Sequence, residues 1–371
     1  MDKTEPFEIF LVVTPGLEQP LAEEARALGF DAPIVSPGGV TVQGHWPDVW
    51  RANLWLRGAT RVLVRIGAFR AFHLAQLDKR ARKFPWAETL RADVPVRVEV
   101  TCRKSKIYHA KAAAQRIERA LSEVLGAQID PKADLAVKVR IEDDLCAISL
   151  DTSGESLHKR GHKPAVGKAP MRETMAAMFL RQCRFDGSEP VYDPMCGSGT
   201  FVLEAAEIAI GRAPGRSRSF AFEKLASFDV QIWDEMRRAE TPNSTDRRFY
   251  GSDRNDGAIA NSIRNAEAAG VDGITRFHRA AISDIVPPDG PPGLVIVNPP
   301  YGARIGNKKL LFGLYGAFGQ VMKERFSGWR VGVITSDGGL AKATALPFQS
   351  PGPPVAHGGL KVKLYQTPKL S

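Results

Sequence analysis

The chain has few cysteines for its length, with four among 371 residues. Cys102, Cys146, Cys183 and Cys196 lie far apart and form no Cys-x-x-Cys pair. This spacing argues against a disulfide framework and against a zinc site. The histidines also lack the spacing of metal ligands. We therefore expect no bound metal and interpret most of the cysteines as small core residues.

Long hydrophobic runs are absent as well. No apolar run approaches the roughly 20 residues that a membrane-spanning helix requires, and the stretch from Ile9 to Val13 is too short for a signal-peptide core. We therefore expect a cytoplasmic protein without a membrane partner. The sequence contains no internal repeat or low-complexity segment, and its length predicts two or three globular domains.

Positive charge is abundant and unevenly distributed. The formal net charge is +10. Between Arg51 and Arg119 there are 17 Lys and Arg against 5 Asp and Glu, and this net of +12 exceeds the charge of the whole chain. Such a concentration indicates a polyanionic partner, and we interpret it as an RNA-binding surface. A solvated basic face without a ligand is the alternative.

The first 155 residues show a pattern typical of an α+β region. The apolar spacing predicts strands over 7–14, 40–42, 61–66, 94–102, 135–142 and 145–151, and helices over 17–28 and 108–125. The elements from 94 to 151 are similar to half or more of a split βαβ sandwich. We divide this region into residues 1–60 and residues 61–155.

From residue 156 onward the pattern changes to strands that alternate with helices. Strands are predicted over 191–194, 249–253, 275–280, 294–298 and 330–335, and helices over 171–183, 200–210, 258–269 and 310–326. This alternation predicts a doubly wound, largely parallel sheet. A terminal β-hairpin is only partly legible, with 361–366 as its clearest strand.

A glycine-containing loop runs from Asp193 to Thr200, between a predicted strand and a predicted helix. Gly197 and Gly199 let a ligand approach the backbone, and the helix N-terminus exposes N–H groups. Val202 replaces the last glycine of a dinucleotide fingerprint and no Lys follows as in a P-loop, which disfavours pyrophosphate and triphosphate ligands. The acidic Asp193 suits S-adenosylmethionine, which carries an ammonium and a sulfonium. A purely structural turn is the alternative.

Two further carboxylates follow the next predicted strands. Asp253 could accept hydrogen bonds from both hydroxyls of a ribose, and Asp284 is placed to accept from an adenine amino group. A single Asp at a strand end is commonly a turn residue or a helix cap. Three at successive strand ends favour a nucleoside-binding edge.

The sequence Asn298-Pro299-Pro300-Tyr301 follows an apolar run typical of a buried strand. The two prolines fix the backbone and remove two N–H donors, which leaves carbonyls free to accept. The Asn298 side chain and the Pro299 carbonyl could together orient an exocyclic amino group for methyl transfer, while Tyr301 stacks on the base. An ordinary Asn-Pro-Pro loop is the alternative.

These motifs, in this order, resemble the THUMP-domain class I RNA methyltransferases, and in particular the ribosomal RNA large subunit methyltransferase L type. Further segments carry the resemblance across nearly the whole chain: Thr14-Pro15-Gly16-Leu17-Glu18, Lys104-Ser105-Lys106-Ile107-Tyr108, Leu157-His158-Lys159-Arg160-Gly161-His162 and Ala169-Pro170-Met171-Arg172-Glu173-Thr174. Some members carry a second methyltransferase domain, and because this chain ends at Ser371 we expect a single activity.

The resemblance implies an α/β fold with a Rossmann-like class I methyltransferase domain over 156–371. This domain follows an α+β region with a ferredoxin-like part over 1–60 and a THUMP domain over 61–155. The implied cofactor is S-adenosylmethionine, and the implied reaction forms N2-methylguanine in 23S rRNA, with RNA held by Arg51 to Arg119. The implied cofactor-binding residues are Asp193, Pro194, Cys196, Gly197, Ser198, Gly199, Thr200, Asp253, Arg254, Asp284, Asn298 and Thr174. The implied catalytic residues are Asn298, Pro299, Pro300 and Tyr301, and residues 169–174 would close the cofactor pocket.

Three alternatives stay open at this point. The substrate could be tRNA, because THUMP modules commonly serve tRNA enzymes. The motif at Asn298 also suits adenine N6 in DNA or a glutamine side chain in protein, although the N-terminal region argues against both. A non-catalytic RNA-binding ribosome assembly factor with the same fold is the alternative of a different class.

Overall fold

The computed structural model describes residues 5–164, 171–302 and 308–371. The chain forms two compact units, each of which is assembled from separate segments. The first unit contains the described residues of 1–13, 22–157 and 218–239. The second contains the described residues of 14–21, 158–217 and 240–371. The chain therefore enters each unit more than once.

The first unit is built on a seven-stranded sheet with the order β2-β3-β1-β4-β7-β6-β5. Its strands are β1 (Phe7–Val12), β2 (Ile34–Ser36), β3 (Gly39–Gly44), β4 (Arg61–Arg70), β5 (Val96–Arg103), β6 (Leu135–Glu142) and β7 (Leu145–Asp151). Neighbouring strands are antiparallel except for β5 and β6, which are parallel. Strands from both 1–60 and 61–155 belong to this one sheet.

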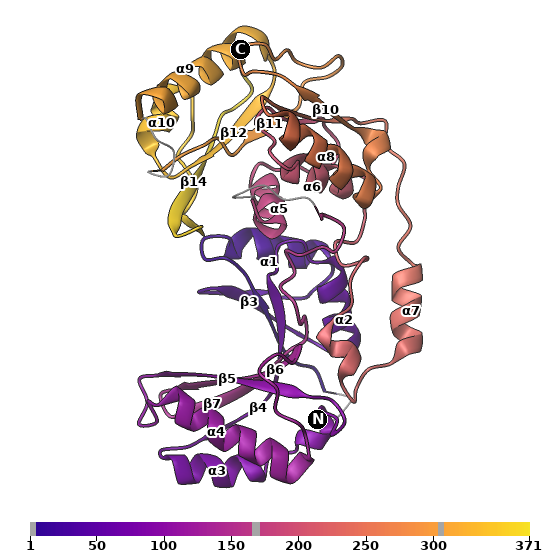
Figure 1. Ribbon diagram of the computed structural model, residues 1–371, viewed down its shortest axis with the longest axis vertical. Coiled ribbons are helices and arrows are strands. Elements are labelled where there is room, and N and C mark those ends of the chain that lie inside the picture. The colour runs from indigo at the N-terminus through magenta and orange to yellow at the C-terminus, as the bar shows by residue number, and fades with distance from the viewer. Residues whose placement is uncertain (1–4, 165–170, 303–307) are drawn as a thin grey trace. The chain divides into compact units, whose positions relative to one another are not determined.

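The strands of this sheet alternate between buried and accessible residues. In β4, Val62 and Val64 are buried whereas Arg61, Leu63 and Arg65 are partly accessible. Successive side chains of a strand point to opposite faces, so one face forms the core and the other stays open. Helices α3 and α4 lie side by side below the β5–β7 end of the sheet (Figure 1). The helices of this unit are α2 (Trp46–Trp55), α3 (Leu74–Arg82), α4 (Ala110–Ala120) and α7 (Val230–Arg238), with short helical turns at Trp86–Glu88, Leu121–Leu125 and Ala221–Lys224. Helix α1 (Glu18–Ala27) is divided between the two units after Leu21.

The segment 218–239, which contains α7, returns to the first unit after the chain has entered the second. Phe222 stacks on Trp50 with ring centroids 6.1 Å apart, and its edge meets Trp233 at 5.0 Å. Phe228 adds an edge-to-face contact to Trp50 at 5.8 Å. Aromatic burial therefore holds this distant segment against α2.

The second unit contains a seven-stranded sheet with the order β10-β9-β8-β11-β12-β14-β13. Its strands are β8 (Val191–Asp193), β9 (Phe249–Asp253), β10 (Thr275–Arg279), β11 (Leu294–Val297), β12 (Arg330–Thr335), β13 (Val355–His357) and β14 (Leu360–Gln366). The pairs from β10 to β12 are parallel, and β14 is antiparallel to both β12 and β13. The strand order reverses between β8 and β11, which is the usual ligand-binding point of such a sheet.

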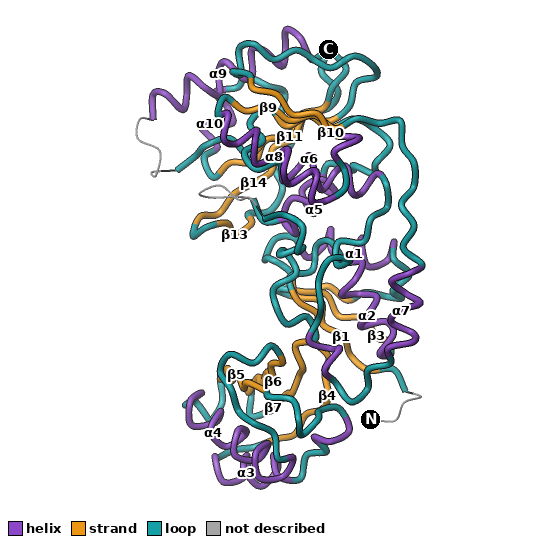
Figure 2. The backbone as a smooth tube through the Cα atoms, turned by 45° about the vertical axis from the view of Figure 1, so that its right-hand side comes forward, coloured by secondary structure: helices purple, strands orange, loops and turns teal. Residues whose placement is uncertain are grey.

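Helices cover both faces of this sheet. Its helices are α5 (Glu173–Gln182), α6 (Thr200–Ala209), α8 (Asp256–Ala269), α9 (Lys308–Arg325) and α10 (Gly338–Ala343), with a helical turn at Asp272–Ile274. Helices α6 and α8 lie side by side, and α9 lies near α10 (Figure 2). Helix α6 packs against β8 and β9, α8 packs against β9 and β10, and α10 packs against β12. All four residues of β11 are buried, as expected for a central parallel strand.

The α/β class and the mostly parallel second sheet confirm the sequence-based prediction, and the sequence located most of the long elements. Four helices, α2, α3, α7 and α10, and the short strands β2 and β13 were not predicted. Strand β4 runs to Arg70 rather than ending at residue 66, with an irregular register between Arg65 and Gly67. Among the described residues, none of the helices is long and apolar enough to cross a membrane.

Candidate functional site

The predicted site residues converge on one edge of the second sheet. Asp193 pairs with Gly251 and is the last residue of β8, and Asp253 pairs with Arg279 at the end of β9. Parallel strands end at the same edge, and β11 pairs in parallel with β8 on its other side. The loop after β11, which begins at Asn298, therefore opens at the same edge as the loop after β8.

The loop after β8 is tightly braced by its neighbours. Gly197 and Gly199 both have left-handed backbones, with φ of 56° and 81°, a conformation that favours glycine. The Ser262 hydroxyl donates to the Gly197 carbonyl at 3.0 Å, and the Asn265 side chain donates to the Ser198 carbonyl at 3.0 Å. A Cβ at Gly197 would meet no atom within 4 Å. The backbone of Gly197 is thus accessible to a ligand, while the loop itself is fixed.

Asp193 is a buried carboxylate whose loss of hydration is offset by few hydrogen bonds. Its side chain is 2% exposed and accepts one hydrogen bond, at 3.1 Å, from the Met195 N–H. Burial raises the pKa of Asp193 to about 8, and the nearby Asp253 carboxylate adds to the effect. A carboxylate in this state gains from a positively charged ligand. This fits the ammonium and sulfonium of S-adenosylmethionine.

The second carboxylate, Asp253, is fixed by two backbone N–H groups. One of its oxygens accepts from the Gly197 N–H at 3.1 Å and the other from the Asn255 N–H at 2.9 Å. Arg254 and Asp284 lie beyond the ends of β9 and β10 and are exposed. The Ser283 hydroxyl donates to the Asp284 carboxylate at 2.9 Å. The structure therefore fixes Asp253 firmly and leaves Arg254 and Asp284 at the rim.

A buried lysine near the start of α6 was not identified from the sequence. The Lys163 ammonium donates to the Glu173 carboxylate and to the Thr200 hydroxyl, both at 2.7 Å. Its side chain is 5% exposed. Beside Glu173, the Thr174 hydroxyl is buried and has no hydrogen-bond partner among the described residues. An ion pair and an unpaired hydroxyl thus lie near the first residue of α6, whose N-terminal N–H groups favour a carboxylate ligand.

Only part of the predicted lid can be placed. Residues 169 and 170 lie outside the described residues, while Met171 and Thr174 are buried. Lys163 directly follows the segment 157–162 and belongs to none of the predicted site motifs. Its chemical partners, Glu173 and Thr200, are distant in sequence, so no local pattern marked it.

The tetrapeptide after β11 contains an unpaired acceptor. The Asn298 side-chain oxygen is buried and has no hydrogen-bond partner among the described residues. Pro299 is buried, and the Tyr315 hydroxyl donates to the Pro300 carbonyl at 3.4 Å. Burial raises the pKa of Tyr301 to about 12, so this ring stays neutral. Buried acceptors are costly to leave unpaired, and this one suits an amino group.

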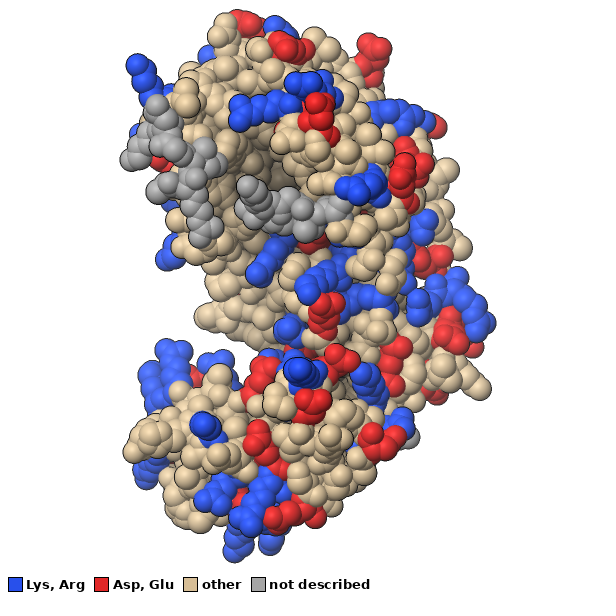
Figure 3. Space-filling view, viewed as in Figure 1, with Lys and Arg blue, Asp and Glu red and all other residues tan. Residues whose placement is uncertain are grey.

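The basic region from Arg51 to Arg119 lies in the first unit. Lys and Arg gather around α3 and α4, where acidic side chains are interspersed (Figure 3). Many of the arginines are compensated: Arg65 pairs with Glu8 at 3.0 Å, and Arg82 pairs with Asp78 at 2.8 Å. Positive charge without an ion pair in the described part of the chain remains at Arg70, Lys79, Arg80, Lys83, Lys104, Lys106, Lys111 and Arg116.

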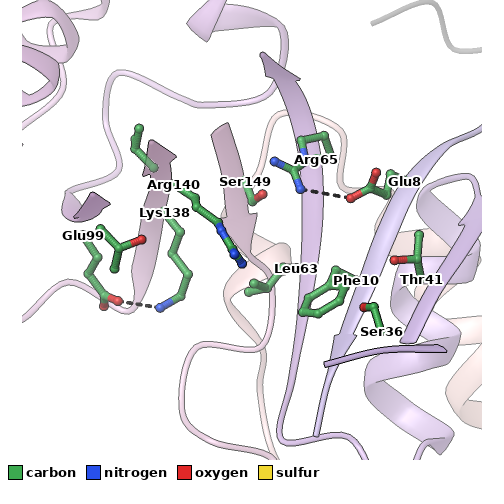
Figure 4. Close-up of a pocket in the computed structure, with 12 residues that line it drawn as sticks. Glu8, Phe10, Ser36, Thr41, Leu63, Arg65, Glu99, Lys138, Arg140 and Ser149 are labelled. Carbon is green, nitrogen blue, oxygen red and sulfur yellow. Dashed lines mark hydrogen bonds and ion pairs between the residues drawn. The ribbon is translucent and has the colours of Figure 1, made fainter. Parts of the chain in front are cut away.

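A cavity of about 400 Å³ lies on the open face of the first sheet (Figure 4). Its lining includes Phe10, Leu63 and the hydroxyls of Ser36 and Ser149. Arg65 faces Glu8 and Lys138 pairs with Glu99 at 2.5 Å, as Figure 4 shows. The third basic group of the lining, Arg140, pairs with Glu142 at 2.5 Å. The cavity therefore adds little uncompensated positive charge, and the loop region around Lys104 is the stronger site for an anionic partner.

Comparisons with known proteins agree with this geometry. A family model described as the RMKL-like methyltransferase domain matches residues 160–349, and one described as the RlmL ferredoxin-like domain matches residues 8–63. The chain is 31% identical to a Synechocystis protein provisionally named an RNA methyltransferase, over 97% of this chain and 96% of that protein. It is 34% identical to a ribosomal RNA large subunit methyltransferase K/L from Syntrophotalea carbinolica over 91% of this chain, and it spans about half of that protein, 50%.

A solved structure is similar along the whole chain. SMU.472, described as a methyltransferase complexed with SAH, has a TM-score of 0.88 and 26% sequence identity. The match covers 99% of this chain and 99% of that one. The likeness therefore extends over both units.

Proposed function

The chain belongs to the RMKL-like methyltransferases and is an S-adenosylmethionine-dependent RNA methyltransferase, and we propose that it methylates the exocyclic N2 of a guanine in 23S rRNA. The observation that carries the proposal is the buried, unpaired side-chain oxygen of Asn298 at the end of β11. Guanine N2 belongs to a planar amino group, which has two N–H donors for such an acceptor.

The cofactor supplies an electrophilic methyl group on a sulfonium. Asp193 provides negative charge for the positive end of the cofactor, and Asp253 provides acceptors for its ribose. Lys163 and the Thr174 hydroxyl provide a cation and a polar group near α6 for the carboxylate of the methionine part. The accessible backbone of Gly197 allows close approach. Together these residues bind and orient the methyl donor.

The residues after β11 act on the amino group. The Asn298 side-chain oxygen and the Pro299 carbonyl accept hydrogen bonds from the two N–H groups of this amine. These hydrogen bonds direct the nitrogen lone pair towards the incoming methyl group. The neutral Tyr301 ring offers an aromatic face for the base. An aromatic amine is a weak nucleophile while its lone pair is conjugated with the ring. Orientation is thus the main contribution of the protein, and the proton can leave after methyl transfer.

RNA is held, in this proposal, by the loop between β5 and α4. Lys104, Lys106 and Lys111 have no ion pair within the described residues, and the Tyr108 side chain is 73% exposed. The Lys106 ammonium lies 5.1 Å from the centre of the Phe72 ring. The first N–H groups of α4 open into the same loop, and His109 gives no side-chain cap. Lysines, an exposed ring and a helix N-terminus together suit phosphates and unpaired bases.

The reaction is tested by mass-spectrometric mapping of modified nucleotides in cells that lack the protein. We expect one N2-methylguanine to be lost from 23S rRNA and to return with the wild-type protein but not with Asn298→Ala. Loss of a tRNA modification instead would assign the enzyme to tRNA. A lost methyladenine, or full rescue by Asn298→Ala, would contradict the proposed amine chemistry.

A further inference from the structure

The first unit contains a second cavity, of about 240 Å³, on a part of the molecule that the methyl-transfer site does not use. Residues from β1, α2, the turn at Trp86–Glu88 and the returning segment 218–239 surround it. Its lining consists of Phe7, His45, Trp46, Pro47, Trp50, Glu88, Thr89, Ala226, Ser227, Asp229 and Ile232. It is therefore a junction of segments that are distant in sequence.

Three buried polar atoms of this lining have no hydrogen-bond partner in the described residues. They are the indole Nε1 of Trp50, the hydroxyl of Thr89 and the hydroxyl of Ser227. Trp50 is 1% exposed and Thr89 is 3% exposed. Buried polar groups without partners are rare because their desolvation is uncompensated. Three around one cavity suit a polar ligand or ordered water.

The indole of Trp50 is fixed in position. Phe222 stacks on it and Phe228 meets it edge to face. An indole N–H can only donate a hydrogen bond, so the occupant must offer an acceptor at this point. The hydroxyls of Thr89 and Ser227 can donate or accept hydrogen bonds. They therefore do not determine which second functional group the ligand carries.

The charge of the cavity lining indicates the second functional group of the ligand. Asp229 contributes an exposed carboxylate, His45 contributes an imidazole, and neither Lys nor Arg lines the cavity. The Glu88 carboxylate also lines it but has another partner. Asp229 caps α7 through one oxygen, which accepts from the N–H groups of Gln231 and Ile232, and its other oxygen takes no part in the cap. Phe7 and Trp46, with ring centroids 5.1 Å apart, add aromatic surface. Carboxylates beside aromatic rings attract ammonium groups and repel phosphates.

We propose that this cavity binds an alkylammonium group whose carrier also presents a carbonyl, which is the chemistry of a lysine residue. The ammonium lies beside the Asp229 carboxylate and the aromatic rings, and the carbonyl accepts from the Trp50 Nε1–H. This inference goes beyond the proposed methyl transfer and does not depend on it. A free lysine derivative and a lysine of a basic protein partner share this chemistry.

The test observes Trp50 directly in the full-length protein labelled with ¹⁵N at tryptophan. Trp50→Phe assigns its indole N–H resonance. We expect Nα-acetyl-lysine N-methylamide to shift that resonance in a saturable way, and the uncharged norleucine analogue to leave it in place. Asp229→Asn should lower the affinity for the lysine derivative by about fivefold, because asparagine keeps the helix cap and removes the charge. Asp234→Asn, on the same helix outside the lining, should change nothing.

Other ligands separate the sources and the competing explanations. A protein partner is supported if a lysine-containing basic peptide binds with higher affinity than the single residue, as measured by the shift of the Trp50 resonance. Equal affinity supports the free amino acid derivative. Spermidine, which has no carbonyl, should bind more weakly. If spermidine binds as tightly as the lysine derivative, if the norleucine analogue shifts Trp50 equally, or if no ligand shifts it, the proposal is wrong and the polar atoms are satisfied by water.

Discussion

Asn298 shows how one side chain can carry the acceptor chemistry. Its buried oxygen lacks a partner, so the amino group of the target base is expected to complete the site. We expect Asn298→Ala to lower the rate of methyl transfer by about 10²-fold or more, with the affinity for S-adenosylhomocysteine unchanged. Single-turnover transfer of labelled methyl groups and calorimetric binding measure the two effects. Asn261→Ala, on α8, is the matched control, and an equal loss of binding and transfer would sink the assignment.

Asp193 predicts a pH dependence of cofactor binding. Its pKa of about 8 means that the free protein holds the carboxyl protonated at neutral pH, whereas the unfolded chain ionises it near pH 4. The free protein should therefore lose stability as the pH rises from about 4 towards 8.

The same carboxyl changes the affinity in the opposite direction. A cationic cofactor favours the ionised form, so its affinity should rise from pH 6 to pH 8, by up to about tenfold per unit. Calorimetry in buffers of different ionisation enthalpy should also detect proton release on binding at pH 7. In Asp193→Asn both effects should vanish, and a flat affinity profile in the wild type would contradict this role.

Lys163 is expected to contact the methionine end of the cofactor. We expect Lys163→Met to lower the affinity for S-adenosylhomocysteine by roughly tenfold to a hundredfold, because one charge-assisted hydrogen bond is lost. Methylthioadenosine lacks the carboxylate and should bind almost as before. The ratio of the two affinities separates this role from general loss of structure, because an unfolded site would lose both ligands equally.

The residues also show the limits of sequence reasoning. Asp193, Asp253 and Asn298 could be placed at one sheet edge because each ends or directly follows a strand of a parallel sheet, where position along the chain predicts position at the edge. Lys163 could not, because its role depends on contacts with Glu173 and Thr200 that only the folded chain creates.

At the scale of elements, long strands and helices with regular apolar spacing were predicted well. Helix α7 was not, because Val230 and Ile232 are 57% and 41% exposed and Trp233 is its one buried residue in the structure as described. Helix α3 similarly buries only Leu77 and Ala81. Helices that are stabilised mainly by tertiary contacts carry a weak periodic signal.

The loop between β5 and α4 gives a prediction for RNA binding. Reversing Lys104 and Lys106 to Glu should weaken RNA binding and reduce the slope of log affinity against log salt by roughly 1.4 to 1.8, because two phosphate contacts are lost. Titrations at several salt concentrations measure the slope. Lys132→Glu, an exposed change outside the basic region, should leave it nearly unaltered. The double variant would argue against this surface if its slope equalled that of the wild type.

At the scale of the molecule, the predicted division at residue 60 falls between β3 and β4 of the first sheet. The hydrogen-bonded sheet nevertheless continues from β1 to β4 across that point. Sequence patterns describe single elements, and they give no information about which distant strands share a sheet edge. The domain bounds therefore stay a prediction.

The returning segment should matter for the stability of the first unit. We expect Phe222→Ala to cost about 3 to 5 kcal/mol, since the ring is fully buried between Trp50 and Trp233. Hydrogen exchange of α2 and β1 should accelerate, although residue 222 follows the last strand of that unit by many residues. Phe312→Ala removes a ring that is 43% exposed and should cost far less. Unchanged exchange in α2 would show that the segment is dispensable.

This interleaving also has a consequence during synthesis on the ribosome. The first unit lacks part of its core until residue 239 has been made, although its last strand ends at Asp151. At bacterial and eukaryotic elongation rates, the stretch from 157 to 239 takes roughly 4 to 16 s. During that interval the aromatic side chains of the segment 218–239 cannot yet pack on Trp50. The nascent chain therefore exposes apolar surface to which chaperones can bind.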